Sequence, residues 1–429
     1  MERVRKAGII AAAANVHEDD LAKRKRAQAA RASICREFPD VGNLIGSVAG
    51  WDAIGEGVIF NRLRRLAILL GVGLRLRQTS PAGKMTWMEA RRKQCLSKKF
   101  TRNLAVWATS FALSLAQWHH VVLFFGNDLL RTLQAEQGVL DGYPHWRLVQ
   151  SRVLGPWLEE FLSVLFGFKL SLGHVIIAVT TLTLSGVVMF QAGRVIGGRQ
   201  AGWSALLAFH VLFPLTMNHP WLYIWDFFVL LIAAVFMLLI VCRAPWWSFL
   251  LLMTVAFFNH DGALFIGVWM VSNGLAAAWA NRRPDWGMVG GGALGSLGGI
   301  LLVEYLRRSL LKGEIGWKLM GLEPPTDPQP YYFFVHLSEN LNNIFTWTTH
   351  PRPDFLLVIP LTLALALALA VMLVVRHGIK GAPLAIYAVA QVTALLLFTL
   401  IPETRGLLEL VPFLCLGGML AAKPDWDTT

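Results

Sequence analysis

The chain has 429 residues, of which 55% are hydrophobic and 15% are charged, and its mean hydropathy is +0.51. Soluble domains carry about 25% charged residues, so this composition excludes a disordered chain, a fibrous chain and an ordinary cytosolic enzyme. Apolar stretches of membrane-spanning length predict an all-α fold, a polytopic transmembrane helical bundle.

The net charge of +12 belongs to the first 102 residues. They hold 21 Lys and Arg and 9 Asp and Glu, whereas the rest of the chain holds 18 basic and 18 acidic residues. A basic segment beside a membrane is attracted to anionic lipid by about 1 kcal/mol per basic residue. We therefore interpret residues 1–102 as a basic cytoplasmic arm on anionic lipid. Nucleic acid is not expected as a partner, because aromatic residues are sparse among the basic clusters and no nucleic-acid motif occurs.

The first 84 residues differ in composition from the rest of the chain. They consist of Ala- and Arg-rich helix fragments broken by Gly and Pro, without a sustained period. Met85-Thr86-Trp87, a basic group and then an apolar stretch come next, as at the N-terminus of many membrane proteins. We expect residues 1–84 to lie outside the functional core. The four cysteines have no CxxC spacing and predict neither a disulfide framework nor a zinc site.

Ten apolar stretches predict ten spans, since a span needs about 20 residues or somewhat fewer inside a bundle. They are Leu104–Phe125, Leu172–Phe190, Trp203–Met217, Trp221–Cys242, Trp247–Phe258, Ala263–Ala280, Trp286–Leu306, Phe355–Val375, Pro383–Ile401 and Gly406–Ala422. Together they form a transmembrane domain over residues 103–422. The Gly-rich run at 290–299 lies in the seventh stretch and favours close helix packing over a phosphate loop.

Charge sets the predicted orientation, because short cytoplasmic loops of membrane proteins are enriched in Lys and Arg. If the N-terminus is cytoplasmic, the short inner loops contain Arg194, Arg199, Arg243, Arg282, Arg283, Arg376 and Lys380. The short outer turns 218–220, 259–262 and 402–405 contain one basic residue, Arg405. The long segments 126–171 and 307–354 then lie outside, and the tail 423–429 lies inside. We predict a multi-pass protein of a bacterial cytoplasmic (inner) membrane with both termini cytoplasmic.

Six ionisable residues lie at or near the predicted outer ends of the spans. Such residues are costly in a bilayer and are functional candidates by default. They are Asp128, Asp226, His260, Asp261, Glu403 and Arg405. A structural role is open for each: a helix cap for Asp128, a partner on a neighbouring helix for Asp226, a turn cap for His260 and Asp261, and mutual pairing for Glu403 and Arg405.

The first long outer loop predicts two interfacial helices. Leu129–Leu140 is amphipathic, and a second amphipathic stretch begins at Arg152-Val153-Leu154-Gly155-Pro156. The second presents aromatic and Leu residues on one face and Glu159 and Glu160 on the other. Helices of this kind lie in the membrane interface, where they would roof a cavity.

A large first outer loop with an acidic residue and membrane-parallel helices resembles the GT-C superfamily of integral-membrane glycosyltransferases, over roughly residues 104–422. The Arg152-x-x-Gly-Pro stretch, Asn259-His260-Asp261 and Glu403-x-Arg405 look like uncharacterised bacterial members. The resemblance implies transfer of a sugar from a polyprenyl-phosphate donor to an acceptor at the outer membrane face. It also implies that the acidic residue of this loop, Asp128, is catalytic. Asn127 stands where these enzymes usually have a second acid.

The chemistry of that reaction suggests further roles. Asp128 would be the base, and Arg405, with Arg152 and His260, would bind phosphate. Asp226 and Glu403 would orient those cations or the sugar, and Asp261 is a further candidate for substrate binding. No cofactor is expected; a divalent metal held by Asp128, Asp226 and Asp261 stays open, although no spacing signals it. There are two alternatives. The protein is a transporter or flippase for a lipid-linked or small polar substrate, or it is a non-catalytic membrane subunit.

Overall fold

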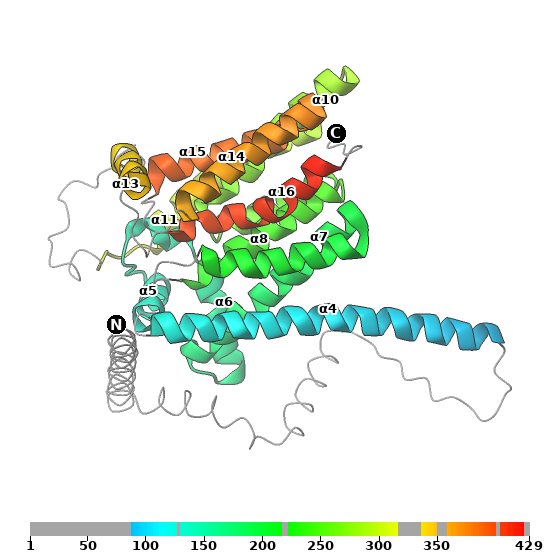
Figure 1. Ribbon diagram of the computed structural model, residues 1–429. Coiled ribbons are helices and arrows are strands. Elements are labelled where there is room, and N and C mark those ends of the chain that lie inside the picture. The colour runs from blue at the N-terminus through cyan, green and yellow to red at the C-terminus, as the bar shows by residue number, and fades with distance from the viewer. Residues whose placement is uncertain are drawn as a thin grey trace, which may run out of the picture. The chain divides into compact units, whose positions relative to one another are not determined.

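The computed structural model describes residues 87–126, 129–216, 222–315, 336–349, 358–399 and 404–423. In these ranges every regular element is a helix (Figure 1). Six helical segments are long and apolar enough to cross a membrane, which indicates a multi-pass membrane protein: Leu170–Leu215, Ile224–Val241, Asp261–Trp279, Trp286–Leu310, Val358–Lys380 and Arg405–Ala422. Trp246–Phe257 and Ala382–Phe398 are shorter apolar helices. The count of ten spans stays a prediction.

The first described helix, α4 (Trp87–Phe125), has 39 residues and contains the predicted span Leu104–Phe125. No Gly or Pro occurs between Trp87 and Asn103 to end a helix there. The boundary predicted between residues 102 and 103 is therefore a change of composition within one helix. The chain forms two units, Met1–Thr86 and Trp87–Thr429, and the first lies outside the described residues, so the arm over residues 1–102 stays a prediction.

Helix α7 (Leu170–Leu215) is a hairpin of two arms. The bend lies at Gly197 and Gly198, where Gly198 has φ +79°, a backbone conformation that favours glycine. Ser110 on α4 contacts both arms, since its hydroxyl donates to the carbonyl of Thr183 at 2.8 Å and lies 3.3 Å from His210 Nε2. The two arms correspond to the predicted stretches Leu172–Phe190 and Trp203–Met217.

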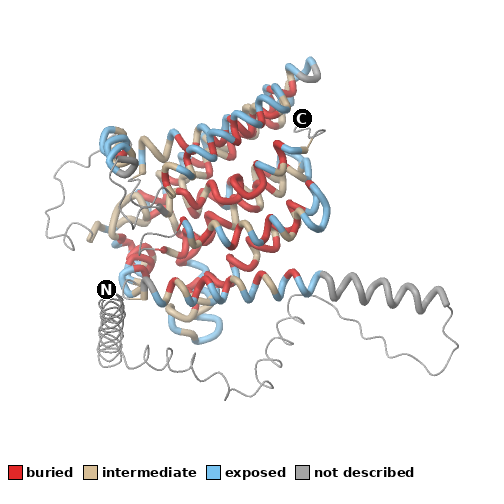
Figure 2. The backbone as a smooth tube through the Cα atoms, viewed as in Figure 1, coloured by how far each residue is buried: buried red, intermediate tan, exposed pale blue. Residues whose placement is uncertain are grey.

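The remaining elements complete a bundle. They are α5 (Leu129–Asp141), η3 (Arg147–Ser151), α6 (Leu154–Phe166), α8 (Ile224–Val241), α9 (Trp246–Phe257), η4 (Asp261–Ala263), α10 (Leu264–Asn281), α11 (Trp286–Leu310), α13 (Leu337–Thr349), α14 (Val358–His377), η5 (Gly378–Lys380), α15 (Ala382–Phe398), η6 (Thr404–Leu410) and α16 (Val411–Ala422). Helix α7 packs on α4, α8 and α16, and α10 packs on α11 and α15. Buried residues concentrate on α7, α8 and α16 (Figure 2).

The last predicted span is divided between two helical elements. The predicted stretch Gly406–Ala422 begins as the 3-10 helix η6 and continues as the α-helix α16 from Val411. Pro412 stands in the first turn of α16, where a proline is tolerated because the first amides of a helix have no intrahelical partner. The change of helix type at Leu410 leaves η6 as a separate element at one end of the bundle.

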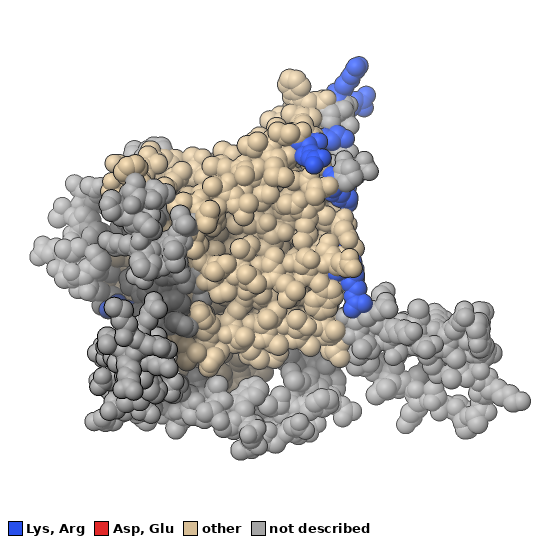
Figure 3. All heavy atoms as spheres, in the orientation of Figure 1, with Lys and Arg blue, Asp and Glu red and all other residues tan. Residues whose placement is uncertain are grey.

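Basic residues mark one end of the bundle. Most Lys and Arg side chains visible in Figure 3 lie at the right-hand end. Exposed arginines stand there near the bend of α7, just after α8 and α10, and in the last turn of α14: Arg194, Arg199, Arg243, Arg282 and Arg376. We call this end the basic end. The opposite end, which we call the far end, carries the start of α8, the turn η4, the last turn of α11 and η6.

The Gly-rich run lies in the middle of helix α11 and packs against its neighbours. A Cβ atom on Gly299 would overlap the ring of Phe257 on α9, and one on Gly292 would lie 2.9 Å from the carbonyl oxygen of Gly267 on α10. A Cβ atom on Gly298 would meet nothing within 4 Å. Close helix packing, rather than a phosphate loop, is therefore the role of this run.

Two alanine substitutions should distinguish the effect of close packing on stability from the effect of helix propensity. Gly299→Ala forces Phe257 to move and should destabilise the protein by about 1–3 kcal/mol, the usual cost of overpacking. Gly298→Ala should be neutral or stabilising by up to ~1 kcal/mol, because alanine is the better helix former. Heat-induced unfolding of both variants in detergent measures the difference, and equal midpoints would contradict the packing.

The predicted orientation can be measured with single cysteines in a background without the four native ones. Ile379→Cys places a thiol in η5 at the basic end, and Lys312→Cys places one just after α11 at the far end; both positions are exposed. A membrane-impermeant maleimide added to intact cells should label residue 312 at once and residue 379 only after permeabilisation. The reverse pattern would invert the topology.

Candidate functional site

Charged side chains meet at the far end of the bundle. We call this set the charged cluster; it consists of Arg152, Asp226, His260, Asp261, Arg307, Arg405 and Glu409. Five of its members were predicted from the sequence, namely Arg152, Asp226, His260, Asp261 and Arg405. The other two predicted residues, Asp128 and Glu403, lie outside the described residues.

Asp226 stands at the third position of α8, in its first turn. Its Oδ2 accepts a hydrogen bond from the backbone N–H of Tyr223 at 3.0 Å, so the carboxylate caps the helix that carries it. The side chain is 5% exposed, and the start of a helix favours a negative charge. This cap on its own helix differs from the structural role left open by the sequence, which was a partner on a neighbouring helix.

Two arginines lie over a pair of stacked rings beside Asp226. The rings of Tyr223 and Trp225 have centroids 4.4 Å apart. The guanidinium carbon of Arg405 lies 4.8 Å from the Tyr223 centroid, and that of Arg152 lies 5.7 Å from the Trp225 centroid. Cation–π contacts hold such planar groups in place and leave their edges for hydrogen bonds. Arg405 and Arg152 also act electrostatically on Asp226.

Arg152 follows η3 and is half-buried. Burial lowers the pKa of its guanidinium; the nearby positive charges of Arg405 and Arg307 act in the same direction, and Asp261 and Asp226 oppose them. An arginine still stays charged at neutral pH. Among the described residues, its buried Nε has no hydrogen-bond partner. Such a donor is costly unless an acceptor binds it, and the oxygen of an anionic ligand is one such acceptor.

Asp261 and Arg307 form the most deeply buried ion pair of the cluster. Arg307 Nη2, on the last turn of α11, donates to Asp261 Oδ2 at 2.6 Å and to the carbonyl of Leu148 at 3.2 Å. The Arg307 side chain is 3% exposed and that of Asp261 is 35% exposed. The pair joins η4 to α11 and to η3, the element before Arg152.

His260 connects the turn before α10 to η6. Its Nδ1 lies 2.9 Å from the backbone N of Gly262 and 3.0 Å from Glu409 Oε1. The nitrogen accepts from the amide when unprotonated and donates to the carboxylate when protonated, so it cannot do both at once. Buried Asn259 fixes this turn by donating to the carbonyl of Trp225 at 2.9 Å. The turn-cap role left open for His260 is therefore present.

A cavity of about 30 Å³ adjoins His260 and Glu409. It has a polar side formed by His260, Gln391 and Glu409, where Gln391 Nε2 donates to Glu409 Oε2 at 3.0 Å. The rest of its lining is largely apolar and comes mainly from α8, with single residues of α9, α10 and α15 and the turn at 259–263. A water needs about 10–15 Å³, so the cavity has room for roughly two waters.

Two members of the cluster were missed in the sequence. Arg307 was assigned to the long outer segment 307–354, although it belongs to α11 and is buried. Glu409 lies in the predicted span Gly406–Ala422, and an acid inside an apolar stretch is itself a signal that could have identified it. Their pairing with Asp261 and His260 depends on contacts between helices that are distant in sequence.

Comparisons with protein-family models, with curated proteins and with solved structures give no match to this chain.

Breaking the Arg307–Asp261 pair should have unequal costs on its two sides. Asp261→Asn leaves a buried guanidinium without its counter-charge and should cost about 3–5 kcal/mol, as for other broken buried pairs. Arg307→Gln leaves only a partly exposed carboxylate and should cost less. The control is Arg308→Gln, which removes an exposed pair with Glu304 and should change stability by less than about 1 kcal/mol. Thermal unfolding in detergent measures all three, and a larger loss for Arg307→Gln than for Asp261→Asn would contradict the assignment.

Proposed function

We propose that this protein is a membrane glycosyltransferase that moves a sugar from a polyprenyl-phosphate donor to an acceptor at the far end of the bundle, the predicted outer membrane face. The observation that carries the proposal is the pair of half-buried arginines, Arg152 and Arg405, that lie over stacked aromatic rings beside Asp226.

This pair suits a phosphate monoester or diester. Guanidinium groups bind phosphate oxygens through two parallel hydrogen bonds, and a low-dielectric site strengthens them. Arg152 has a buried donor that no described residue accepts from. The whole charged cluster holds three arginines and three acids, Asp226, Asp261 and Glu409, so its formal charge is near zero before an anion enters.

A lipid donor needs access from the bilayer. Helix α6 follows Arg152 directly and exposes large apolar side chains: Trp157, Leu158, Phe161, Val164, Leu165 and Phe166. In a membrane protein such a surface suits lipid contact. A polyprenyl chain can therefore lie along α6 while its phosphate reaches Arg152.

The reaction assigns a role to each remaining group. The acceptor hydroxyl attacks the anomeric carbon of the sugar, and the bond between that carbon and the phosphate oxygen breaks. The lipid phosphate leaves with the electron pair and is stabilised by Arg152 and Arg405. Asp128 takes the proton of the hydroxyl as general base. Glu403 orients the phosphate-binding arginines or the sugar, and His260 is the third candidate for phosphate binding.

Binding of polyprenyl phosphate tests the anion site without knowledge of the sugar. Purified protein in detergent should bind a polyprenyl phosphate more tightly than the matching polyprenol, as measured by quenching of tryptophan fluorescence. Arg152→Gln and Arg405→Gln should each weaken phosphate binding about 10-fold or more, since one charged hydrogen bond contributes about 1.5–3 kcal/mol. Arg308→Gln, a loss of exposed charge from the same helix as Arg307, should leave binding unchanged.

Two outcomes would reject the proposal. Equal affinity for polyprenol and polyprenyl phosphate would remove the phosphate site. The Asp128→Asn variant should bind the donor normally but should no longer transfer the sugar. If it releases sugar from a polyprenyl-phosphate hexose as fast as the wild type, Asp128 is not the base. Arg405→Lys should reduce transfer by about 10²-fold, by analogy with the loss of one transition-state hydrogen-bond donor.

A further inference from the structure

We propose that Glu136, Glu159 and His174 bind one divalent transition-metal ion of the Zn²⁺ or Mn²⁺ type, which fastens α5 and α6 to α7. This metal site is separate from the charged cluster, and it does not rest on the glycosyltransferase proposal. It also differs from the set Asp128, Asp226 and Asp261 that the sequence left open.

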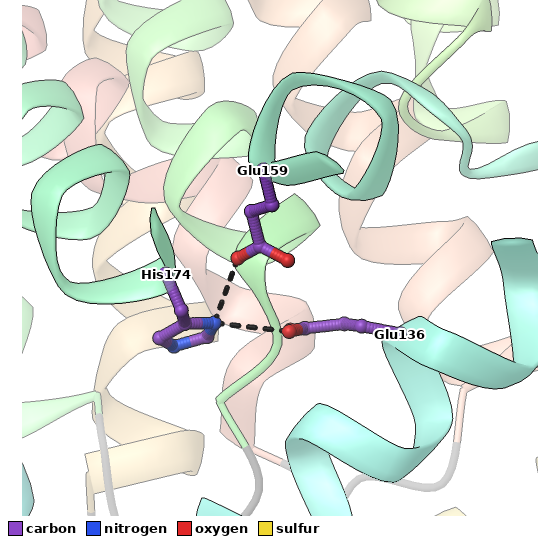
Figure 4. A group of neighbouring side chains, drawn as sticks. All are labelled: Glu136, Glu159 and His174. Atoms are coloured by element: carbon purple, nitrogen blue, oxygen red, sulfur yellow. Dashed lines mark hydrogen bonds and ion pairs between the residues drawn. The ribbon is translucent and has the colours of Figure 1, made fainter. Parts of the chain in front are cut away.

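The three side chains come from three helices and point toward one another (Figure 4). His174 Nδ1 lies 3.0 Å from Glu136 Oε2 and 2.9 Å from Glu159 Oε1. One ligand atom from each residue lies within 4.8 Å of the other two. Bonds of about 2.0–2.2 Å to a tetrahedral ion would separate these atoms by about 3.4 Å, so small side-chain shifts suffice.

Burial makes this set unlike a surface acidic group. The exposed fractions are 1% for the His174 side chain and 0% for the two glutamates. The sequence placed Glu159 with Glu160 on a polar outer face, but only Glu160 is exposed. The difference arises because α6 packs on α7 and turns Glu159 into the protein.

Hydrogen bonds do not satisfy the two carboxylates. Glu136 Oε1 accepts from the backbone N–H of Ile224 at 2.8 Å. Nδ1 of His174 carries at most one proton, yet it faces an oxygen of each carboxylate. Glu159 Oε2 and His174 Nε2 have no hydrogen-bond partner among the described residues. Two buried carboxylates with one shared donor are costly unless a cation lies between them.

The chemistry of the donors selects the class of ion. Imidazole nitrogen and carboxylate oxygen together suit Zn²⁺ and Mn²⁺, and a dication with neutral His174 brings the charge of the site to zero. A cavity of about 10 Å³ borders His174 and Thr132, which is room for about one water. The rings of Trp118 and Phe227 pack against the imidazole and hold its orientation.

The ion would position the start of α8. Glu136 binds the ion through Oε2 and the first amide of α8 through Oε1, and α8 carries Trp225 and Asp226 directly after that amide. Metal-bound carboxylates that also accept a backbone hydrogen bond are held rigidly. The metal is thus a structural element that supports the neighbouring charged cluster.

A shared proton is the competing occupant. Burial first, and then the carboxylate of Glu136, raises the pKa of Glu159 to about 8, so this carboxyl holds a proton at neutral pH when no cation is bound. Gln resembles a protonated carboxyl in shape but is a poor metal ligand. Glu159→Gln therefore separates the two occupants.

The test uses the full chain, purified in detergent from cells grown with added Zn²⁺ or Mn²⁺ and washed with a weak chelator. Elemental analysis should find about one equivalent of metal in the wild type and at least ten-fold less in Glu159→Gln. The matched control Glu160→Gln, the exposed neighbour on α6, should retain the full equivalent. His119→Gln, on exposed α4 surface, should do the same and so exclude adventitious histidine binding.

A stability measurement keeps the proposal testable if Glu159→Gln does not fold. Stripping the wild type with EDTA should lower its unfolding temperature, and adding back Zn²⁺ or Mn²⁺ should restore it. If the unfolding temperature of the metal-free wild type does not change when either ion is added, the proposal is overturned in favour of the shared proton. So would a Glu159→Gln variant with a full equivalent of metal. Neither result would affect polyprenyl-phosphate binding at Arg152, so this failure is distinguishable from failure of the proposed function.

Discussion

The interior of a membrane-spanning bundle and the lipid around it offer charged side chains no water, so each charge must find its partner within the protein. This constraint explains where polar groups lie in the molecule. Exposed arginines gather at the basic end, and the charged cluster gathers at the far end. Between the ends, neutral polar groups pair with one another: Gln117 on α4 donates to the carbonyl of His210 on α7 at 2.6 Å, and its Oε1 lies 3.0 Å from His210 Nδ1.

The start of α8 links the two polar sites at the far end. The first amides of this helix have no acceptor within the helix and favour a negative charge nearby. Two carboxylates from different parts of the chain accept hydrogen bonds from them. Asp226 accepts from Tyr223 N–H within the charged cluster, and Glu136 accepts from Ile224 N–H within the proposed metal site. A shift of this helix start would disturb both sites together. The position of Asp226 thus depends on residues of α5, which is more than 80 residues away in sequence.

Aromatic rings give the proposed anion site its order. Arginine side chains lose much conformational freedom when they bind a ligand, and prior stacking removes part of that cost before the ligand arrives. Tyr223 and Trp225 do this for Arg405 and Arg152. Both rings come from the residues just before Asp226 in the chain. The short segment 223–226 therefore positions the two arginines and also supplies their counter-charge.

Local properties of the chain determined its class and the two ends of the bundle. Several apolar stretches predicted helix starts closely, as at Trp286 of α11, although α4 begins at Trp87 and not at Leu104. The placement of arginines predicted that the ends of α8, α10 and α14 share one end of the bundle, where most visible Lys and Arg side chains lie. Hydropathy and charge act over a single turn or loop, so the sequence displays them directly. The grouping of Asp226, His260, Asp261 and Arg405 was also predicted, because all four lie next to helix ends on the same side.

Only the tertiary structure decided which side chains meet. Adjacent helical residues point about 100° apart, so whether Glu159 or Glu160 turns inward depends on the helix that α6 packs against. The pairing of Arg307 with Asp261 and of Glu409 with His260 likewise joins elements that are separated by 46 residues or more. Sequence alone does not contain these distances, because contacts across a bundle arise from the combined packing of many helices. The candidate residues could therefore be named from the sequence, whereas their partners, and with them the proposed metal site, came from the fold.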